Sequence, residues 1–175
     1  MKIDIHSHKE HSDAILTMLD GREAAGIHPW FINPAKFETD LELKRKNFSP
    51  NILFIGETGL DRIRNVECDF ECQKKAFLQH IQWAKEVNRP LIVHCVRAYP
   101  EILSLLIQKK HPWAVMHDFS ANVEIAEQYF KHEMLYFSFG HRLLSSKSRQ
   151  DIFKIISLDH IFFETDDESI TLEEV

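Results

Sequence analysis

The fold is decided by the stretch at residues 71–94, which reads ECQKKAFLQHIQWAKEVNRPLIVH. Its first part carries apolar residues at helical spacing and predicts an amphipathic helix over 71–87. The members of that apolar stripe are Phe77, Ile81, Ala84 and Val87. The turn signal Asn88-Arg89-Pro90 then ends the helix, and the apolar run Leu91–Val93 predicts a buried strand. This segment is therefore one helix-to-strand unit of an α/β fold.

Short apolar runs and helical patterns alternate in the same way along the whole chain. Eight runs are expected to be strands, at residues 2–5, 15–19, 24–27, 52–55, 91–93, 114–116, 135–139 and 161–163. Helical patterns start at Asn33-Pro34 and cover 71–87, 101–108, 123–130 and 149–156. This alternation predicts a parallel sheet, and eight strands favour a closed, TIM-like (β/α) barrel over an open sheet. We find no repeat and no linker, so residues 1–175 are expected to form a single domain.

The front of this barrel is expected to be abnormal. Only Lys9–Asp13 separates the first two strands, and only Asp20–Glu23 the next two. A parallel crossover with a helix needs about a dozen residues. Either two bare returns therefore replace the first two crossover helices, or this corner is antiparallel. The chain also stops at Val175, soon after the last strand, so the closing C-terminal helices are expected to be missing and the barrel is expected to be incomplete there.

Composition narrows the function. The 27 acidic residues exceed the 21 basic ones and give a net charge of −6, which disfavours a basic nucleic-acid binder. A metal enzyme stays compatible, because ligand carboxylates count as negative until the ions are added. The eleven histidines invite a search for ligand spacing. Three sparse cysteines and the lack of an apolar run of roughly 20 residues favour a reducing, cytoplasmic location without a membrane span.

Potential metal ligands lie at the ends of five expected strands. Asp4, His6 and His8 alternate along the first strand, which places them on one face and Ile3 and Ile5 on the other. Four further strands are followed by Glu57, His94, His117 and Asp166. The carboxyl ends of the strands of a parallel barrel meet at one face. Such polar groups are costly to bury together without a cation, so the pattern predicts a metal centre.

Six short motifs then give the chain a recognisable signature. They are Ile3-Asp4-Ile5-His6-Ser7-His8, Gly26-Ile27-His28-Pro29, Gly56-Glu57-Thr58-Gly59-Leu60-Asp61, Pro90-Leu91-Ile92-Val93-His94, His117-Asp118-Phe119-Ser120 and Glu164-Thr165-Asp166. In this order they resemble the motifs of the TatD family, metal-dependent hydrolases of the amidohydrolase-like TIM-barrel group. The chain resembles a short variant of that family.

The resemblance implies a binuclear centre and a nuclease. His6 and His8 would hold one ion with Asp166, and Glu57 would bridge to a second ion held by His94 and His117. The implied reaction is hydrolysis of phosphodiester bonds, usually of DNA from an end, by a metal-activated water that Asp166 orients or deprotonates. Nitrogen and oxygen ligands accommodate Zn, Mg, Mn, Ni or Co, so the two divalent ions stay unidentified. Asp4 is expected to accept the N–H of a ligand imidazole.

Cationic loop residues are the candidates for substrate binding. Guanidinium groups suit phosphate oxygens, and His28 at a strand end is expected to touch substrate. The candidates for phosphate contact are His28, Arg62, Arg97, His141 and Arg142. The remaining histidines match no motif and are expected in packing or on the surface: His11, His80, His111, His132 and His160. Cys68 and Cys72 lack partner ligands, which argues against a structural zinc site.

Two other functions stay open. The negative net charge slightly favours a metallohydrolase of small or acyl substrates, such as an amide, a lactone or an aminoacyl ester. The shortened front favours a non-enzymatic barrel subunit of a larger complex. In that case Ile3, Ile5 and alternate members of 15–19 would face water, and another copy of the chain or a companion protein would cover them. The alternative cover is Ile170–Val175, folded back.

Overall fold

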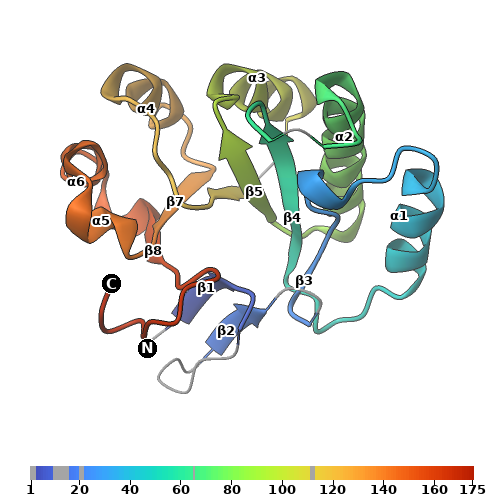
Figure 1. Cartoon of the computed structure of the whole chain (residues 1–175), viewed down its shortest axis with the longest axis horizontal. Helices are drawn as coiled ribbons and strands as arrows, with labels where there is room; N and C mark the ends of the chain where they lie inside the picture. The colour runs from blue at the N-terminus through green and yellow to red at the C-terminus, as the bar shows by residue number, and fades with distance from the viewer. Residues whose placement is uncertain (1–2, 10–15, 20–21, 65, 111–112) are drawn as a thin grey trace.

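Eight parallel strands form one curled sheet in the computed structural model, which describes residues 3–9, 16–19, 22–64, 66–110 and 113–175 (Figure 1). The strands are β1 (Ile3–Ser7), β2 (Leu16–Leu19), β3 (Ala24–Ala25), β4 (Phe54–Asp61), β5 (Leu91–Val96), β6 (Ala114–Met116), β7 (Leu135–Phe139) and β8 (Ile161–Phe163). Their order is β2-β1-β8-β7-β6-β5-β4-β3. This is the strand order of a (β/α) barrel, which confirms the predicted fold. Within the described residues β2 and β3 do not pair, so the barrel is open between them.

Helices cover the outer side of the sheet from β4 to β8 (Figure 1). They are α1 (Phe37–Lys46), α2 (Phe70–Val87), α3 (Tyr99–Lys109), α4 (Val123–Tyr129), α5 (Arg142–Ser145) and α6 (Lys147–Phe153), with short 3-10 turns η1 (Pro29–Phe31) and η2 (Leu158–His160). In the described part of the chain no helix precedes η1, as the short connections predict. β1 and β2 pair in parallel, which excludes the antiparallel alternative for this pair. Most of Lys9–Asp13 lies outside the described residues.

Two apolar clusters stabilise the fold. The larger one packs the helices against the sheet and contains the fully buried rings of Phe77, Trp83 and Tyr129. The smaller one joins Ile5 and Val115 to four partly buried residues, namely Ile3 on the same strand as Ile5 and Phe54, Tyr136 and Phe162 on other strands. Side chains from five strands can meet only on the concave face of a curled sheet.

The smaller cluster corrects the expectation that Ile3 and Ile5 face water. Ile5 is only 3% exposed and Ile3 is partly buried. The pairing register of β1 with β2 shifts between Asp4 and Ser7. Such an irregularity breaks strict alternation, so apolar and polar residues of one strand can both be buried. The two isoleucines therefore give no support to a companion protein on this flank. The side chains of 16–19 lie outside what the structure describes.

Two glycines let β4 lie directly against β5 beside Glu57. A Cβ atom on Gly59 would lie 1.9 Å from the carbonyl oxygen of His94, and one on Gly56 would lie 2.5 Å from that of Ile92. Both glycines also have positive φ angles, +155° at Gly56 and +151° at Gly59, which side chains of L-residues rarely allow. The Gly-x-x-Gly spacing around Glu57 is therefore what brings this carboxylate next to the β5 residue His94.

The cysteines differ from the expectation. Cys68 and Cys72 form a disulfide at the start of α2, while Cys95 is free and buried. Four residues of separation across a helix start bring the two Cα atoms to 5.4 Å, within disulfide reach, which a count of cysteines does not reveal. The cysteines therefore no longer support a reducing compartment. No helix in the described residues is long and apolar enough to cross a membrane.

Candidate metal centre

All six predicted ligand residues meet at the carboxyl ends of the strands. His6 lies on β1, Glu57 on β4 and His94 on β5. His8, His117 and Asp166 lie just past the ends of β1, β6 and β8. Every one of them except the deeper His6 lines a pocket of about 390 Å³. The structure thus assembles in space a group that is spread over 160 residues of sequence.

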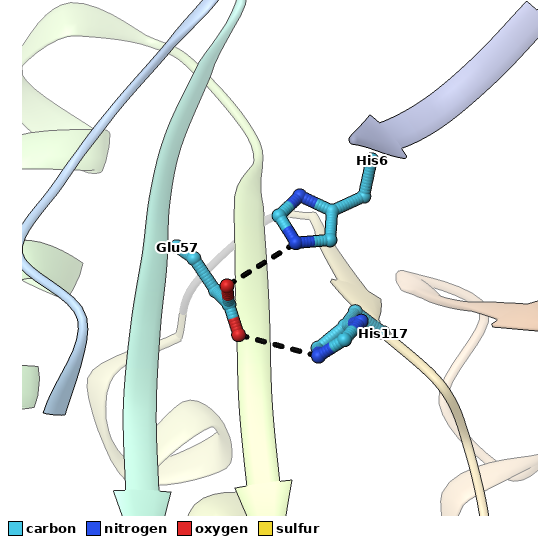
Figure 2. A group of neighbouring side chains, drawn as sticks. All are labelled: His6, Glu57 and His117. Atoms are coloured by element: carbon cyan, nitrogen blue, oxygen red, sulfur yellow. Dashed lines mark ion pairs between the residues drawn. The ribbon is translucent and has the colours of Figure 1, made fainter. Parts of the chain in front are cut away.

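Glu57 lies at the centre of this group. Its Oε2 is 3.2 Å from Nε2 of His6, and its Oε1 is 3.2 Å from Nε2 of His117 (Figure 2). The same Oε1 lies 2.9 Å from Nδ1 of His94. Burial alone would raise the pKa of Glu57, but His117 and His6 lower it to well below its usual range. Glu57 is therefore an ionised carboxylate between two sets of imidazoles, as a bridging ligand would be.

A second set lies at the rim of the pocket. Oδ1 of Asp166 is 3.7 Å from Nε2 of His6 and 3.6 Å from Nε2 of His8. The side chains of His8 and Asp166 are 32% and 31% exposed, so this set opens to solvent. Backbone hydrogen bonds hold it together: Asp166 N–H donates to the His6 carbonyl, and His8 N–H donates to the Asp166 carbonyl. Asp166 has a φ of +52°, a strained conformation that is frequent at functional sites.

Two carboxylates that the sequence interpretation left without a role support the imidazoles. Glu164 is fully buried and lies 3.1 Å from Nδ1 of His117, so that Nε2 of His117 faces Glu57. Asp61 lies 3.3 Å from Nε2 of His94, which leaves Nδ1 of His94 toward Glu57. Carboxylates behind ligand histidines fix ring orientation and basicity in metal sites. Both residues belong to the motifs quoted in the sequence analysis, and this membership was the signal in the sequence that could have identified them.

His117 also shows the electrostatic effect of this support. Burial would lower its pKa, but Glu164 and then Glu57 raise the pKa of His117 to well above the ordinary value. Glu164 in turn accepts hydrogen bonds from the Asp118 N–H and from the Ser138 hydroxyl. The imidazole of His117 is thus held between two anions, and one of these, Glu164, is fixed by two further donors.

The hydrogen bonding of His6 indicates whether these residues fit a cation. The residue is fully buried, and neither ring nitrogen has a hydrogen-bond partner among the described residues. Its closest ionic neighbours are the carboxylates of Glu57 and Asp166. A buried polar atom without a partner costs free energy, which a bound cation would offset. Three groups have ligand atoms within 4.8 Å of one another: His6–Glu57–His117, His6–His8–Asp166 and His28–Glu57–His94.

The other predicted residues are distributed unequally. His28 and Arg142 line the pocket, and His28 belongs to the cluster itself because its Nε2 is 3.2 Å from Oε1 of Glu57. His141 lines a small hollow beside the pocket and lies 3.6 Å from Glu168. The structure does not bring Arg62 or Arg97 to the pocket. Arg62 pairs with Glu101 and lies over the ring of Phe70, and Arg97 is exposed.

Asp4 and two aromatic residues add contacts that the sequence interpretation did not include. Asp4 is buried and accepts hydrogen bonds from the N–H and the hydroxyl of Thr165, so it holds the residue beside Asp166. Its contact with a ligand imidazole stays a prediction. The sequence interpretation gave no role to Trp30 and Phe31, which line the pocket. The indole N–H of Trp30 donates to Asp61 at 2.7 Å, which ties this ring to the support of His94.

Comparisons with known proteins agree with this geometry. Residues 3–169 match the sequence profile of a family described as TatD related DNase. The chain is 36% identical over 109 residues to the 3'-5' ssDNA/RNA exonuclease TatD of Erwinia billingiae, covering 59% of this chain and 40% of that protein. It is 30% identical over 148 residues to an uncharacterized metal-dependent hydrolase, YcfH, of Escherichia coli, covering 82% of this chain and 54% of that protein. The chain spans about half the length of the curated relatives it matches.

A solved structure matches over more of its length. The crystal structure of YJJV, a TatD homolog from Escherichia coli, superposes with a TM-score of 0.79 over 94% of this chain and 78% of that chain. The sequence identity of that pair is 18%, so this likeness concerns the fold. The fold of this chain is thus that of a known barrel.

Proposed function

Because the chain belongs to the TatD-related DNase family, we propose that it is a divalent-metal-dependent phosphodiesterase that hydrolyses single-stranded DNA or RNA. The observation that supports this most directly is the buried His6, whose ring nitrogens lack hydrogen bonds while two carboxylates lie beside it. The named activity of the Erwinia relative supports the choice of a nucleic-acid substrate and of attack from the 3' end.

Each predicted ligand has a place in this proposal. His6, His8 and Asp166 would hold one ion at the rim, and His94 and His117 a second ion deeper in the pocket. Glu57 would bridge the two, because its oxygens face both sets. Two divalent ions bound in this way supply Lewis acidity, which polarises a phosphate and lowers the pKa of a water molecule. His28 lies close enough to Glu57 and His94 to join the deeper set.

The side chains around these ligands would position the substrate. Asp166 is the ligand carboxylate that opens to solvent, so we assign it the additional role of orienting the attacking water and accepting its proton. Asp61 and Glu164 hold the imidazoles of His94 and His117 in orientation. Arg142 lines the pocket and pairs with Asp118, from where its guanidinium can reach a phosphate oxygen.

The experiment that tests the proposal is a metal screen on oligonucleotides labelled at one end. The purified chain is stripped with a chelator and then supplied with Mg, Mn, Zn, Co or Ni, one at a time. We expect a single strand that carries a label at its 5' end to shorten progressively from the 3' end, and only when a divalent ion is present. The Glu101→Gln variant is the control that keeps activity, since the partly exposed Glu101 pairs with Arg62 outside the pocket.

The same screen includes substrates of the alternative class. A nitrophenyl ester, a lactone and a small amide are tested under each metal condition, with metal content measured by elemental analysis. Cleavage of these compounds without cleavage of oligonucleotides would replace the proposal with a metallohydrolase of small or acyl substrates. A chain that binds metal and cleaves neither class would favour the non-enzymatic subunit.

A further inference from the structure

Phe31 is an aromatic residue whose exposure the fold does not require. Its side chain is 76% exposed at the end of the η1 turn. Two hydrogen bonds hold the backbone of that turn: the Phe31 N–H donates to the His28 carbonyl, and the Trp30 N–H donates to Nδ1 of His28. An exposed aromatic ring is hydrated unfavourably, and a polar residue would serve this backbone equally well. Its position against the candidate centre therefore calls for a functional explanation.

The ring of Phe31 lies between two pockets that share the candidate ligands. The first is the pocket of about 390 Å³ that contains the predicted ligands. The second has a volume of about 400 Å³ and opens toward α1. Phe31, His28 and Glu57 line both. A ligand that extends past Phe31 in either direction therefore stays within reach of Glu57.

The neighbouring Trp30 shows what the ring of Phe31 lacks. Trp30 donates its indole N–H to Asp61, and the guanidinium carbon of Arg64 lies 4.1 Å from its ring centroid. Phe31 has one aromatic contact within the described residues, a tilted one with His28 at 5.6 Å between centroids. Trp30 is thus held by the protein, whereas Phe31 presents a ring to the pocket.

Each pocket also offers a cation beside its acidic side chains. Arg142 lines the first pocket with Asp167 and Glu168, and Lys44 lines the second with Asp40. Together with the ring, these two cationic side chains form an arrangement of cation, ring and cation. A ligand with a flat aromatic group between anionic groups matches this arrangement. An unpaired strand of nucleic acid has that chemistry, since its bases have open faces and its phosphates alternate with them.

We propose that Phe31 is a stacking platform for an unpaired nucleobase next to the phosphate that is cleaved. This inference rests on the proposed function and deepens it, because it names the group of the substrate that is recognised. Stacking requires an open base face, so a paired end is excluded and every base is accepted. Arg142 lies in the pocket that takes the cleaved phosphate, and Lys44 lies in the second pocket on the other side of the ring.

The test compares a normal 3'-terminal nucleotide with an abasic one. The substrates are two single-stranded oligonucleotides that differ only in whether the last sugar carries a base. Stacking on an aromatic side chain corresponds to roughly 5-fold to 100-fold in binding, so we expect the wild type to prefer the base by that factor in kcat/KM. We expect Phe31→Ala to lose the preference while cleaving the abasic substrate as well as the wild type does, and Phe31→Trp to retain it.

Leu158→Ala is the matched control. Leu158 is also 76% exposed, and it lies in η2, which precedes β8 and is therefore at the opposite end of the sheet from the pocket. This variant removes a similar exposed apolar surface and is expected to keep the full preference for the base. Equal melting temperatures of the three variants and the wild type establish that each one is folded.

A binding measurement without catalysis separates this inference from the proposed function. An oligonucleotide with 2-aminopurine at its 3' end is titrated with protein in a chelator, and stacking quenches its fluorescence. Quenching by the wild type that Phe31→Ala loses supports the inference, even if no cleavage occurs and the proposed function fails. Absence of quenching by the wild type, equal quenching by Phe31→Ala, or an unchanged preference for the base in Phe31→Ala overturns it while leaving nuclease activity unaffected.

Discussion

Two fully buried histidines lie in different regions of the protein and differ in what their ring nitrogens contact. His80 lies on α2, where its Nε2 accepts a hydrogen bond from the Ile27 N–H at 3.0 Å and its Nδ1 lies 2.8 Å from the Ala76 carbonyl oxygen. His6 lies on β1, where neither nitrogen has a hydrogen-bond partner in the described residues. Both side chains have no exposed surface.

This difference separates a packing histidine from a candidate ligand better than burial does. The protein tolerates a buried imidazole at His80 because both ring nitrogens have hydrogen-bond partners in the backbone. The hydrogen bond from the Ile27 N–H also holds Ile27 against α2. The same burial at His6 leaves two polar atoms to be satisfied by something else. The neighbours of His6 are carboxylates and imidazoles, and this set of side chains could hold a metal ion.

The largest effect is expected when the group that faces His6 is neutralised. Glu57→Gln keeps the size of the side chain but removes the charge that lies within 3.2 Å of both His6 and His117. We expect kcat/KM on a single-stranded oligonucleotide to fall by at least about 100-fold, the order found when one electrostatic contributor to a transition state is lost. Metal content per chain should fall as well. The comparison is with Glu101→Gln, and activity above a tenth of the wild type in Glu57→Gln would contradict the bridging role.

The second test measures the two histidines directly in metal-free protein. His80→Leu leaves the buried Ile27 N–H without an acceptor, which costs about 1–3 kcal/mol, whereas the Ala76 carbonyl keeps its backbone donor within α2. We expect urea unfolding to show a loss of roughly 1–3 kcal/mol for His80→Leu. His6→Leu breaks no hydrogen bond among the described residues and removes the ion pairs with the two neighbouring carboxylates, so its loss should be smaller than that of His80→Leu. Equal losses would show that the two regions do not differ as argued.

The sequence alone predicts part of the candidate site. Strand-end positions predicted that His6, Glu57, His94 and Asp166 converge, and the structure brings them together. Which nitrogen of His94 or His117 turns toward Glu57 depends on Asp61 and Glu164, so these supports cannot be assigned without the three-dimensional arrangement.

Two other expectations failed for local reasons. The alternation that placed Ile5 outside is interrupted by the register shift between Asp4 and Ser7, and period-two patterns do not reveal an irregularity of this kind. The disulfide between Cys68 and Cys72 depends on the path of the turn into α2, which residue counts do not describe.

The third prediction concerns the support behind His117. Glu164→Gln removes the charge that orients this imidazole, although the amide oxygen can still accept from the Asp118 N–H. Loss of such a support typically weakens metal affinity by about 10-fold to 100-fold. Titration calorimetry with Mn or Zn measures this, with the exposed Glu133→Gln as a control far from the centre. If both variants bind metal as tightly as the wild type, Glu164 has no part in holding a ligand.

The smallest effect expected is a pH dependence that belongs to His80 alone. Burial lowers the pKa of His80 from 6.5 to about 4 in the folded protein, with smaller effects of Lys44 and Arg45 in the same direction. The unfolded chain therefore takes up a proton below about pH 6.5 that the folded chain excludes until about pH 4, so acid favours unfolding across this range. Between about pH 7 and about pH 5.5 the free energy of unfolding should fall by roughly 1 kcal/mol because of His80.

The control is His80→Gln, which has no titrating ring and can still donate and accept a hydrogen bond. Its free energy of unfolding should not show the part of the fall that comes from His80. The carboxylates and the other histidines occur in both proteins, so their contributions cancel when the two unfolding profiles are subtracted. Parallel profiles for wild type and His80→Gln in chelator would mean that His80 takes up its proton in the folded state too, and that its hydrogen bonds do not hold it neutral.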